Sequence, residues 1–441
     1  MRTVASHPLF AALMAAAAVT GCIGPDTVFV PPPRPSNPAA AKPASADAAP
    51  AAVASPTSAT PAPATPASAT PSGAAVAPTA TAHASSAATP AASTTAASAP
   101  PAAPPSETLG LQPAATPVRE RPGWRRPQVI LVTEHLKDIV PQLQTAVPAG
   151  VKLIVLSAAT PRDIAAADAT LGVCSPEVLA QATRLQWIQW MGAGVEGCVH
   201  QPLLHQHRVL LTNMQRVSGP SMAEHVIALM MALSRHLNYF MREQQQGHWA
   251  DEDTPQLADL EGRTVLVVGL GGIGTEVARR AHALGMRVTA IRASGHEGPD
   301  YVSYVGLPGE LLRLTRDADF IVNCTPLTPQ TTGIFNREFF AAMKPSAYFL
   351  SVGRGRSAVT ADLIAALSSG TIAGAGLDVV DPEPLPPDSP LWRLPNVIIT
   401  PHVSADTAIS DQVRTALLRE NLRRYAAGEP MLAVVDIERG Y

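Results

Sequence analysis

The sequence is poor in charge for its length. Charged residues make up 15% of the 441 residues, and the formal net charge is -3. A chain with this balance has no overall field that would attract nucleic acid or an acidic lipid surface. We therefore expect no nucleic-acid partner, and we expect two or three domains from the length.

Cysteine is also scarce, with four in the whole chain. Cys22 stands apart, which leaves Cys174, Cys198 and Cys324. Three is an odd number, and these residues lack the spacing of metal ligands. The sequence therefore predicts free, mostly buried thiols, no disulfide framework and no metal site.

No apolar run near the N-terminus is long enough to cross a membrane. Arg2 precedes an apolar segment from Leu9 to Val19, a pattern that fits an export signal. Val19-Thr20-Gly21-Cys22 resembles the bacterial lipobox, in which the cysteine is lipidated. We predict a signal over residues 1–22 and a lipid anchor on Cys22 that holds an exported protein at the membrane, facing the periplasm. The alternative is a misassigned start codon and a cytoplasmic protein.

Proline, in contrast, is abundant, and most of the 44 prolines precede Pro127. The segment from Val30 to Pro117 consists largely of Ala, Pro, Ser and Thr. Such a composition has too little apolar mass for a core. We predict a disordered linker over residues 23–126 that ends in a solvated basic hinge, Arg119 to Arg126.

The pattern changes from Gln128 onward, where short apolar runs alternate with helical stretches. This alternation predicts an α/β fold with parallel sheets. One long helix is expected from Ser221 to Arg242, and a C-terminal helix from Thr407 to Tyr425. The expected strands are 128–133, 151–156, 185–191, 264–268, 287–291, 319–323, 347–351, 373–378 and 397–400.

A glycine-rich turn joins one of these strands to a helix. The strand Thr264 to Val268 runs into a G-x-G-x-x-G pattern, and residues 275–285 have helical composition. This context predicts a dinucleotide site, because the turn brings the backbone close to a pyrophosphate at a helix N-terminus. The predicted contacts are Gly269, Gly271, Gly272, Ile273 and Gly274.

The second strand of this unit ends on a basic residue. An NAD enzyme usually has Asp or Glu there to bind the ribose, whereas this chain has Arg292, with Ser294 two residues later. A guanidinium can pair with a 2′-phosphate. We therefore favour NADP(H) as the cofactor, with NAD(H) possible if Arg292 faces solvent.

Further loops rich in Gly, Pro or Thr follow the other strands. Ligands of open parallel sheets bind beyond the carboxyl ends of the strands, so these loops can converge on one site. A glycine turn at 192–195 could hold a carboxylate on its backbone N–H groups, or it could be a plain tight turn. The remaining candidates in these loops are Cys324, Thr325, Pro326, Val352, Gly353, Arg354, Asp378, Glu383 and His402.

From about Gln128 to its end, the chain resembles the D-isomer-specific 2-hydroxyacid dehydrogenase family. Arg292 brings it nearest to the glyoxylate/hydroxypyruvate reductase branch. The motifs that carry the resemblance, in chain order, are GAGVEG at 192–197, TN at 212–213, AEHVIALMMAL at 223–233, GLGGIG at 269–274, CTPLTPQTTGIF at 324–335, VGRGRSAV at 352–359, GLDVVDPEPLP at 376–386 and TPHVS at 400–404.

The resemblance implies a role for each of these candidates. His402 would be the acid/base, Glu383 its supporting carboxylate, and Arg354 the residue that binds the substrate carboxylate and polarises the carbonyl. Asp378 would lie at the nicotinamide amide. The carboxylate would also rest on the backbone of the turn formed by Gly192, Ala193, Gly194 and Val195.

The resemblance also implies an architecture of two Rossmann-like, doubly wound domains. The substrate domain would comprise residues 127–228 and 408–441, and the inserted dinucleotide-binding domain residues 229–407. A homodimer is implied, with the helix from residue 221 to 242 near its interface.

Two positions depart from the family pattern. Arg216 stands where many relatives carry glycine, and Thr360 replaces the usual aspartate after the RGxxV motif. The sequence leaves the substrate open among glyoxylate, hydroxypyruvate and larger 2-oxoacids. A second hypothesis is a tethered, non-catalytic module that keeps the fold and senses a nucleotide or a partner.

Overall fold

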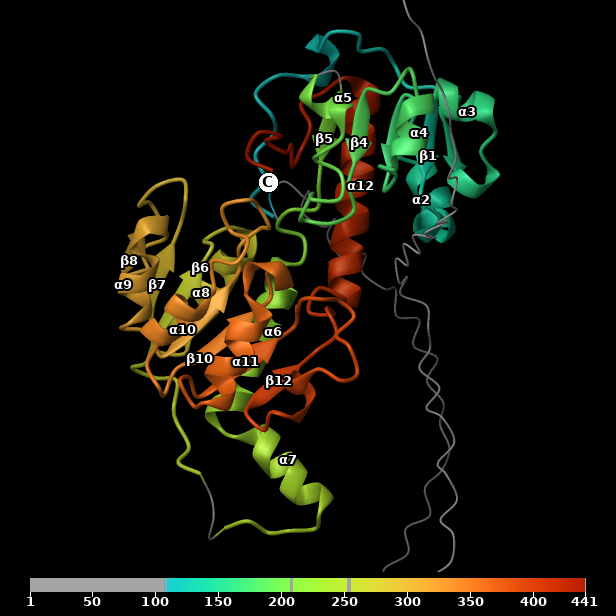
Figure 1. Ribbon diagram of the computed structural model, residues 1–441. Helices are drawn as coiled ribbons and strands as arrows, with labels where there is room; N and C mark the ends of the chain where they lie inside the picture. Colours follow the sequence, from blue (N-terminus) through green and yellow to red (C-terminus); the bar gives the residue numbers. More distant parts are fainter. Residues whose placement is uncertain (1–106, 108, 207–208, 252–254, 441) are drawn as a thin grey trace, which may run out of the picture. The chain divides into compact units, whose positions relative to one another are not determined.

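The structure, a computed structural model, describes residues 107, 109–206, 209–251 and 255–440. The predicted signal, Cys22 and most of the predicted linker lie outside the described residues. Residues 101–441 form one compact unit, and its described part contains two parallel β-sheets (Figure 1). The α/β fold with two doubly wound sheets is therefore confirmed.

The first sheet has five parallel strands in the order β2-β1-β3-β4-β5. The sequence patterns did not predict β3 and β5. The strands are β1 (Val129–Val132), β2 (Lys152–Val155), β3 (Ala169–Leu171), β4 (Trp187–Gln189) and β5 (Leu210–Thr212). The helices between them are α2 (Val140–Gln144), α3 (Pro161–Ala166), α4 (Pro176–Gln181) and α5 (Pro202–His205).

The second sheet has seven parallel strands in the order β12-β11-β10-β9-β6-β7-β8. The strand order reverses between β6 and β9, and ligands of such sheets bind at this point. The strands are β6 (Thr264–Val268), β7 (Arg287–Ile291), β8 (Tyr304–Gly306), β9 (Phe320–Asn323), β10 (Tyr348–Ser351), β11 (Gly374–Leu377) and β12 (Val397–Ile399). Its helices include α8 (Gly272–Ala283), α9 (Leu311–Thr315), α10 (Arg337–Ala342) and α11 (Thr360–Ser368).

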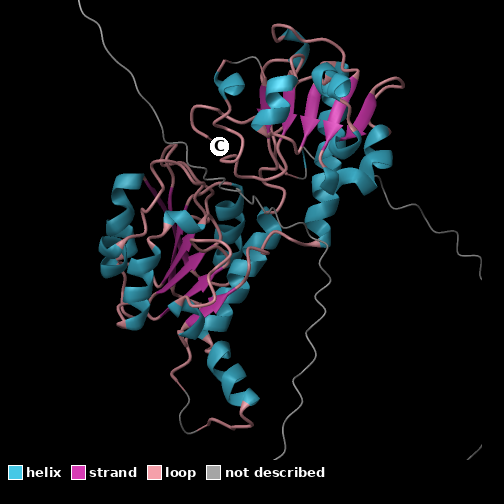
Figure 2. Ribbon diagram, turned by 45° about the vertical axis from the view of Figure 1, so that its right-hand side comes forward, coloured by secondary structure: helices cyan, strands magenta, loops and turns pink. Residues whose placement is uncertain are grey.

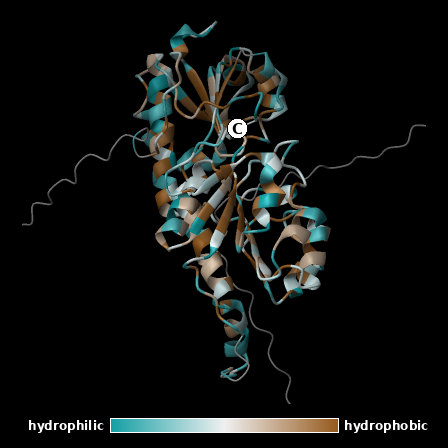
Figure 3. Cartoon of the chain, turned by 90° about the vertical axis from the view of Figure 1, so that its left-hand side faces the viewer, coloured by the Kyte–Doolittle hydropathy of each residue, from teal (hydrophilic) through white to brown (hydrophobic). Residues whose placement is uncertain are grey.

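Helices cover both faces of the second sheet (Figure 2). Alternate residues of β6 enter two different cores: Val265 and Val267 pack in one, and Leu266 and Val268 in the other. Figure 3 shows the strands as the most hydrophobic segments, with helices of mixed polarity around them. A strand buried on both faces reads as an unbroken apolar run, which is why the sequence predicts β6 with its observed bounds.

The predicted helix from Ser221 to Arg242 is two helices, α6 (Gly219–Ser234) and α7 (Leu237–Gln245). The break falls at His236, whose backbone is left-handed with a φ of 50°. An apolar periodicity continues through such a break, so the sequence pattern does not reveal it. The buried residues of α6 belong to a core of the second sheet. Residues 219–228, which the sequence analysis assigned to the substrate domain, thus pack with the second sheet.

The predicted linker boundary at residue 126 is too late. Leu109, Leu111 and Val118 are buried in a core of the first sheet, together with residues of α12 (Ala408–Ala427). The basic segment is also less solvated than predicted, because Arg125 Nε lies 2.9 Å from the carboxylate of buried Asp168. A few apolar residues are enough to anchor this segment in the core of the first sheet. The high proline content of the region does not indicate their burial.

In the part of the chain that the structure describes, no helix has the length and apolar character needed to span a bilayer. The predicted signal and anchor at residues 1–22 lie outside that part.

The stability of the fold should depend on the buried carboxylate of Asp168. Its side chain is fully buried and accepts bonds from Arg125, Arg184 (3.3 Å) and the N–H of Gln128 (2.7 Å). We expect Asp168→Asn to lower the free energy of unfolding by about 2–4 kcal/mol, because the amide leaves partly buried cations without a charge partner. Urea titration of the full chain measures it.

The matched control is Glu134→Gln, the same change in an exposed pair with Lys137 at 3.7 Å. Exposed pairs contribute little, so this variant should stay within about 0.5 kcal/mol of the wild type. Equal effects of the two substitutions would contradict the structural role of Asp168.

Candidate active site

A histidine and a glutamate meet beyond the ends of two neighbouring strands. His402 follows β12 and Glu383 lies in the loop after β11; His402 Nδ1 is 2.9 Å from Glu383 Oε2. The other carboxylate oxygen accepts the backbone N–H of Val380 at 3.0 Å. The side chains are 45% and 37% exposed. Since Nδ1 is occupied by the carboxylate, Nε2 is the ring nitrogen left to act on a ligand.

This pairing changes the protonation of both groups. The hydrogen bond to Glu383 raises the pKa of His402 above its ordinary value, against an opposing effect of burial and of the positive charge of Arg354. Burial alone would raise the pKa of Glu383, but the hydrogen bonds from His402 and Val380 outweigh it and lower that pKa. The pair therefore favours an imidazolium beside a carboxylate, which is a proton donor usable near neutral pH.

Asp378 holds the loop that carries His402. Its carboxylate is buried and accepts the hydroxyl of Thr400 (2.7 Å) and the backbone N–H groups of Val403 (3.0 Å) and Ser404 (3.2 Å). His225 reaches the same place, with Nε2 2.9 Å from Thr400 Oγ1. The aspartate that the resemblance places at the nicotinamide amide thus also fixes the backbone around the histidine.

Arg354 brings a cation to the glycine turn at 192–195. It follows β10, and its Nη1 donates to the carbonyl of Gly353 at 2.8 Å. A Cβ at Gly194 would lie 2.2 Å from Arg354 Nη2, so only glycine leaves room for the guanidinium there. The structure therefore brings together the two groups that the sequence analysis assigned to a substrate carboxylate.

Glu196 is a residue of this site that the sequence analysis missed. Its carboxylate forms an ion pair with Arg354 Nε, and both side chains are partly buried. The GAGVEG motif could have indicated this ion pair. A carboxylate next to a turn that is predicted to bind another carboxylate needs a cation to offset the repulsion.

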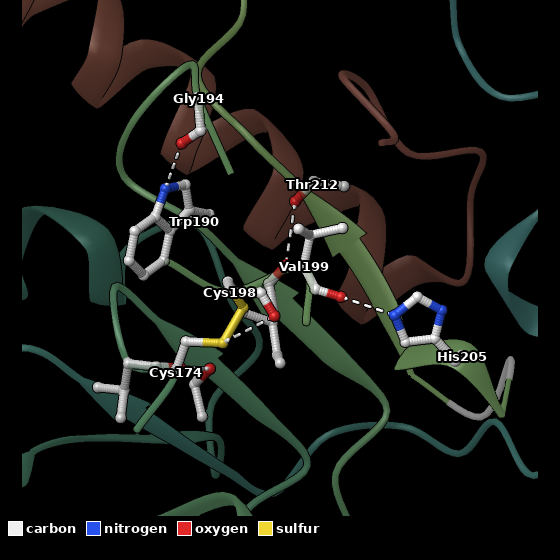
Figure 4. Close-up of a disulfide and its surroundings, with 10 residues drawn as sticks. Cys174, Trp190, Gly194, Cys198, Val199, His205 and Thr212 are labelled. Carbon is white, nitrogen blue, oxygen red and sulfur yellow. Dashed lines mark hydrogen bonds between the residues drawn. A yellow bond between two sulfur atoms is a disulfide. The ribbon is translucent and has the colours of Figure 1, made fainter. Parts of the chain in front are cut away.

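The turn itself is braced from several sides. Trp190 Nε1 donates to the carbonyl of Gly194 at 2.7 Å, as Figure 4 shows. Asn213 Nδ2 donates to the carbonyl of Ala193 at 2.7 Å, and the side chain of Val195 is buried. The turn is thus held by side chains from the segments that directly follow β4 and β5.

A disulfide lies beside this turn, and the prediction of free thiols is wrong for two of the three cysteines. Cys174 and Cys198 are bonded, with 5.7 Å between their Cα atoms (Figure 4). Cys174 follows β3 and Cys198 follows the glycine turn after β4. Because these strands are neighbours, their ends bring together two cysteines 24 residues apart, which spacing alone does not reveal. Cys324 is free and buried as predicted, and burial raises the pKa of its thiol to about 12.

The glycine turn after β6 has the shape that a dinucleotide requires. Gly269 has a φ of 101°, and a Cβ there would lie 2.8 Å from the carbonyl oxygen of Cys324. A Cβ at Gly274 would lie 2.1 Å from the carbonyl oxygen of Gly269. At Gly271 a Cβ would meet nothing within 4 Å, so this backbone is open to a ligand. The residues present fit the pyrophosphate of a dinucleotide at the start of α8, where Ile273 is the second residue.

Two more predicted cofactor loops lie next to each other. Thr325 is buried and its hydroxyl donates to Asn323 Oδ1 at 2.7 Å. A Cβ at Gly353 would lie 2.7 Å from the carbonyl oxygen of Thr325, so the segments after β9 and β10 are in contact. Pro326 and Val352 belong to the same two segments.

Arg292 and Ser294 follow β7, as predicted. Arg292 is partly buried, and its Nη1 donates to the carbonyl of Glu297 at 2.9 Å. Ser294 is exposed. A cation therefore stands where an NAD enzyme usually has a carboxylate.

The chain is similar to known proteins over this fold. Residues 227–404 match the NAD-binding domain of the D-isomer specific 2-hydroxyacid dehydrogenases. A glyoxylate/hydroxypyruvate reductase A of Serratia proteamaculans is 32% identical over 273 residues, which cover 60% of this chain and 84% of the relative. A glyoxylate reductase of Korarchaeum cryptofilum is 35% identical over 227 residues, 50% of this chain and 67% of the relative.

Solved structures extend the match. A D-isomer specific 2-hydroxyacid dehydrogenase from Xanthobacter autotrophicus, in complex with NADPH and MES, superimposes with a TM-score of 0.64 at 29% identity. An NADPH-dependent glyoxylate/hydroxypyruvate reductase from Sinorhizobium meliloti, with NADP and sulfate, gives 0.63 at 28% identity. Both matches cover 72% of this chain and 100% of the other. The family match, the relatives and the solved structures agree. The chain therefore belongs to the D-isomer specific 2-hydroxyacid dehydrogenase family of oxidoreductases.

Proposed function

We propose that this protein reduces a small 2-oxoacid, such as glyoxylate or hydroxypyruvate, to the D-2-hydroxyacid with NADPH. The observation that carries the proposal is the His402–Glu383 pair, which lies beyond β11 and β12, while Arg354 lies beyond the neighbouring strand β10. A proton donor and a carboxylate-binding cation therefore lie beyond neighbouring strands at one edge of the second sheet, as a substrate with a carbonyl next to a carboxylate requires. The names of the relatives from Serratia proteamaculans and Sinorhizobium meliloti support this substrate class.

The residues divide the reaction between them. NADPH, when bound, supplies the hydride that C2 of the 2-oxoacid accepts. His402 Nε2 gives its proton to the carbonyl oxygen, so that the carbonyl becomes a hydroxyl and the imidazolium becomes neutral imidazole. Arg354 and the backbone of the turn at 192–195 hold the substrate carboxylate and stabilise negative charge on the reacting oxygen. Glu383 keeps the imidazole oriented and protonated.

The preference for NADPH is proposed from Arg292. Its guanidinium can pair bidentately with a 2′-phosphate, where a carboxylate would repel it. The solved relatives in complex with NADPH or NADP support the same choice.

We further propose that the protein is an exported, lipid-anchored homodimer. The Cys174–Cys198 disulfide supports export, since disulfides persist mainly in oxidising compartments. Exposed apolar side chains on and after α7 support self-association: Leu237 is 47%, Met241 60% and Trp249 86% exposed.

The first prediction concerns substrate and cofactor. With the full chain, we expect NADPH oxidation that depends on a 2-oxoacid and is slow with a carbonyl compound that lacks a carboxylate. Arg292→Ala should raise the KM for NADPH about tenfold and leave the KM for NADH unchanged, because only NADPH carries the 2′-phosphate. Steady-state assays with both cofactors over a 2-oxoacid panel measure this. Comparable wild-type rates with NADPH and NADH would sink the cofactor assignment.

The second prediction concerns pH. Reduction needs protonated His402, so kcat/KM should fall as the pH rises through the raised pKa of that residue. Glu383→Gln removes the carboxylate that raises the pKa, and the alkaline limb should therefore move to lower pH. His402→Ala should lose roughly 10²–10⁴-fold in kcat at every pH. An unmoved limb in Glu383→Gln, with NADPH binding intact, would exclude the pair as the acid.

The third prediction concerns the anchor and the assembly. Cells that express the full chain should incorporate labelled fatty acid into a membrane-bound protein, and Cys22→Ala should abolish the label and release the protein. Sedimentation of the released variant should give twice the mass of the chain. Unlabelled wild-type protein in the cytosol would remove the lipoprotein proposal, and a monomer mass would remove the dimer.

A further inference from the structure

Arg216 is a departure from the family pattern with an unusual backbone. It lies in the loop between β5 and α6, with a φ of 69°. This left-handed region is disfavoured for residues with a side chain and is readily adopted by glycine. The described non-glycine residues with a positive φ number four, and one of them is His402. A strained backbone persists where the surrounding structure or a ligand requires it.

The stem of Arg216 lies on the dinucleotide turn. A Cβ at Gly272 would lie 2.8 Å from Arg216 Cγ and 3.2 Å from its Cα. The start of α6 also touches the turn, since a Cβ at Gly219 would lie 3.0 Å from the carbonyl oxygen of Gly272. The space beside Gly272 is therefore filled by Arg216, whereas the space beside Gly271 is open.

The guanidinium of Arg216 has no charged partner among the described residues. It is exposed, and the contact recorded for it is weak: Nη1 is 3.5 Å from the carbonyl oxygen of Leu109. The cations on α8 itself are committed, since Arg279 and Arg280 both pair with Glu276. Arg216 is thus the cation beside this turn that can accept an anionic partner without giving up an ion pair.

We propose that Arg216 binds the pyrophosphate of the dinucleotide and adds a positive charge to the backbone N–H groups and the helix dipole of this turn. The proposal rests on the proposed function, because it requires a dinucleotide at α8. The left-handed backbone at 216 keeps the stem against Gly272, next to the open backbone of Gly271. NADPH and NADH both contain the pyrophosphate, so Arg216 should contribute to the binding of both. Arg292 differs, because it should contribute to the binding of NADPH alone.

The test is fluorescence titration of NADPH and NADH with the full chain and its variants. Arg216→Gly removes the cation and suits the left-handed backbone, so the protein should fold with an equal or higher unfolding midpoint. We expect the Kd values of NADPH and NADH to rise together, each about tenfold, because each loses one charge-assisted contact. Arg216→Asn, which also tolerates this backbone, should match the glycine variant, and Arg216→Lys should retain most of the affinity.

Arg292→Ala is the matched control, since it removes a cation from the same cofactor site but should weaken NADPH alone. Unchanged Kd values in Arg216→Gly and Arg216→Asn would overturn the proposal, and so would a loss confined to NADPH. A lower unfolding midpoint with unchanged Kd values would mean that Arg216 stabilises the fold through its contact with Leu109 and does not bind the cofactor. Failure of the wild type to bind either nucleotide would instead overturn the proposed function, and the inference with it.

Discussion

The buried carboxylate of Asp378 organises the reacting end of this protein. The carboxylate accepts three hydrogen bonds from the segment Thr400 to Ser404. The backbone carbonyl oxygen of Asp378 accepts a fourth from the backbone N–H of His402, at 2.8 Å. An exposed imidazole would otherwise sample several positions. Because its backbone is fixed on both sides by a group that has no access to water, His402 can stay half exposed and still hold one geometry against Glu383.

The sequence predicts the parts of this arrangement that follow from long apolar strands and from glycines. Strand β6 and the turn after it are recognisable because a strand buried on both faces is continuously apolar and because Gly269 and Gly274 have no room for a Cβ. Once the sheet is parallel, its strand ends share one edge, and this places the loops that hold Arg354, Glu383 and His402. The residues of the candidate site could be predicted for this reason.

Other features depend on tertiary contacts that leave no local pattern. Strands β3 and β5 were not predicted, and the break at His236 interrupts the backbone without interrupting the apolar pattern. The Cys174–Cys198 bond depends on which strands are neighbours, which is decided by the whole sheet. The segment 109–126 was obscured by the composition before it, although a few of its side chains enter the first core.

The ion pair between Arg354 and Glu196 has a consequence for what the site can admit. A guanidinium that already holds a carboxylate exchanges partners when an acid arrives, so much of the cost of stripping water from the cation is met before binding. A neutral aldehyde offers nothing to exchange, so the proposed site favours a substrate that carries a carboxylate.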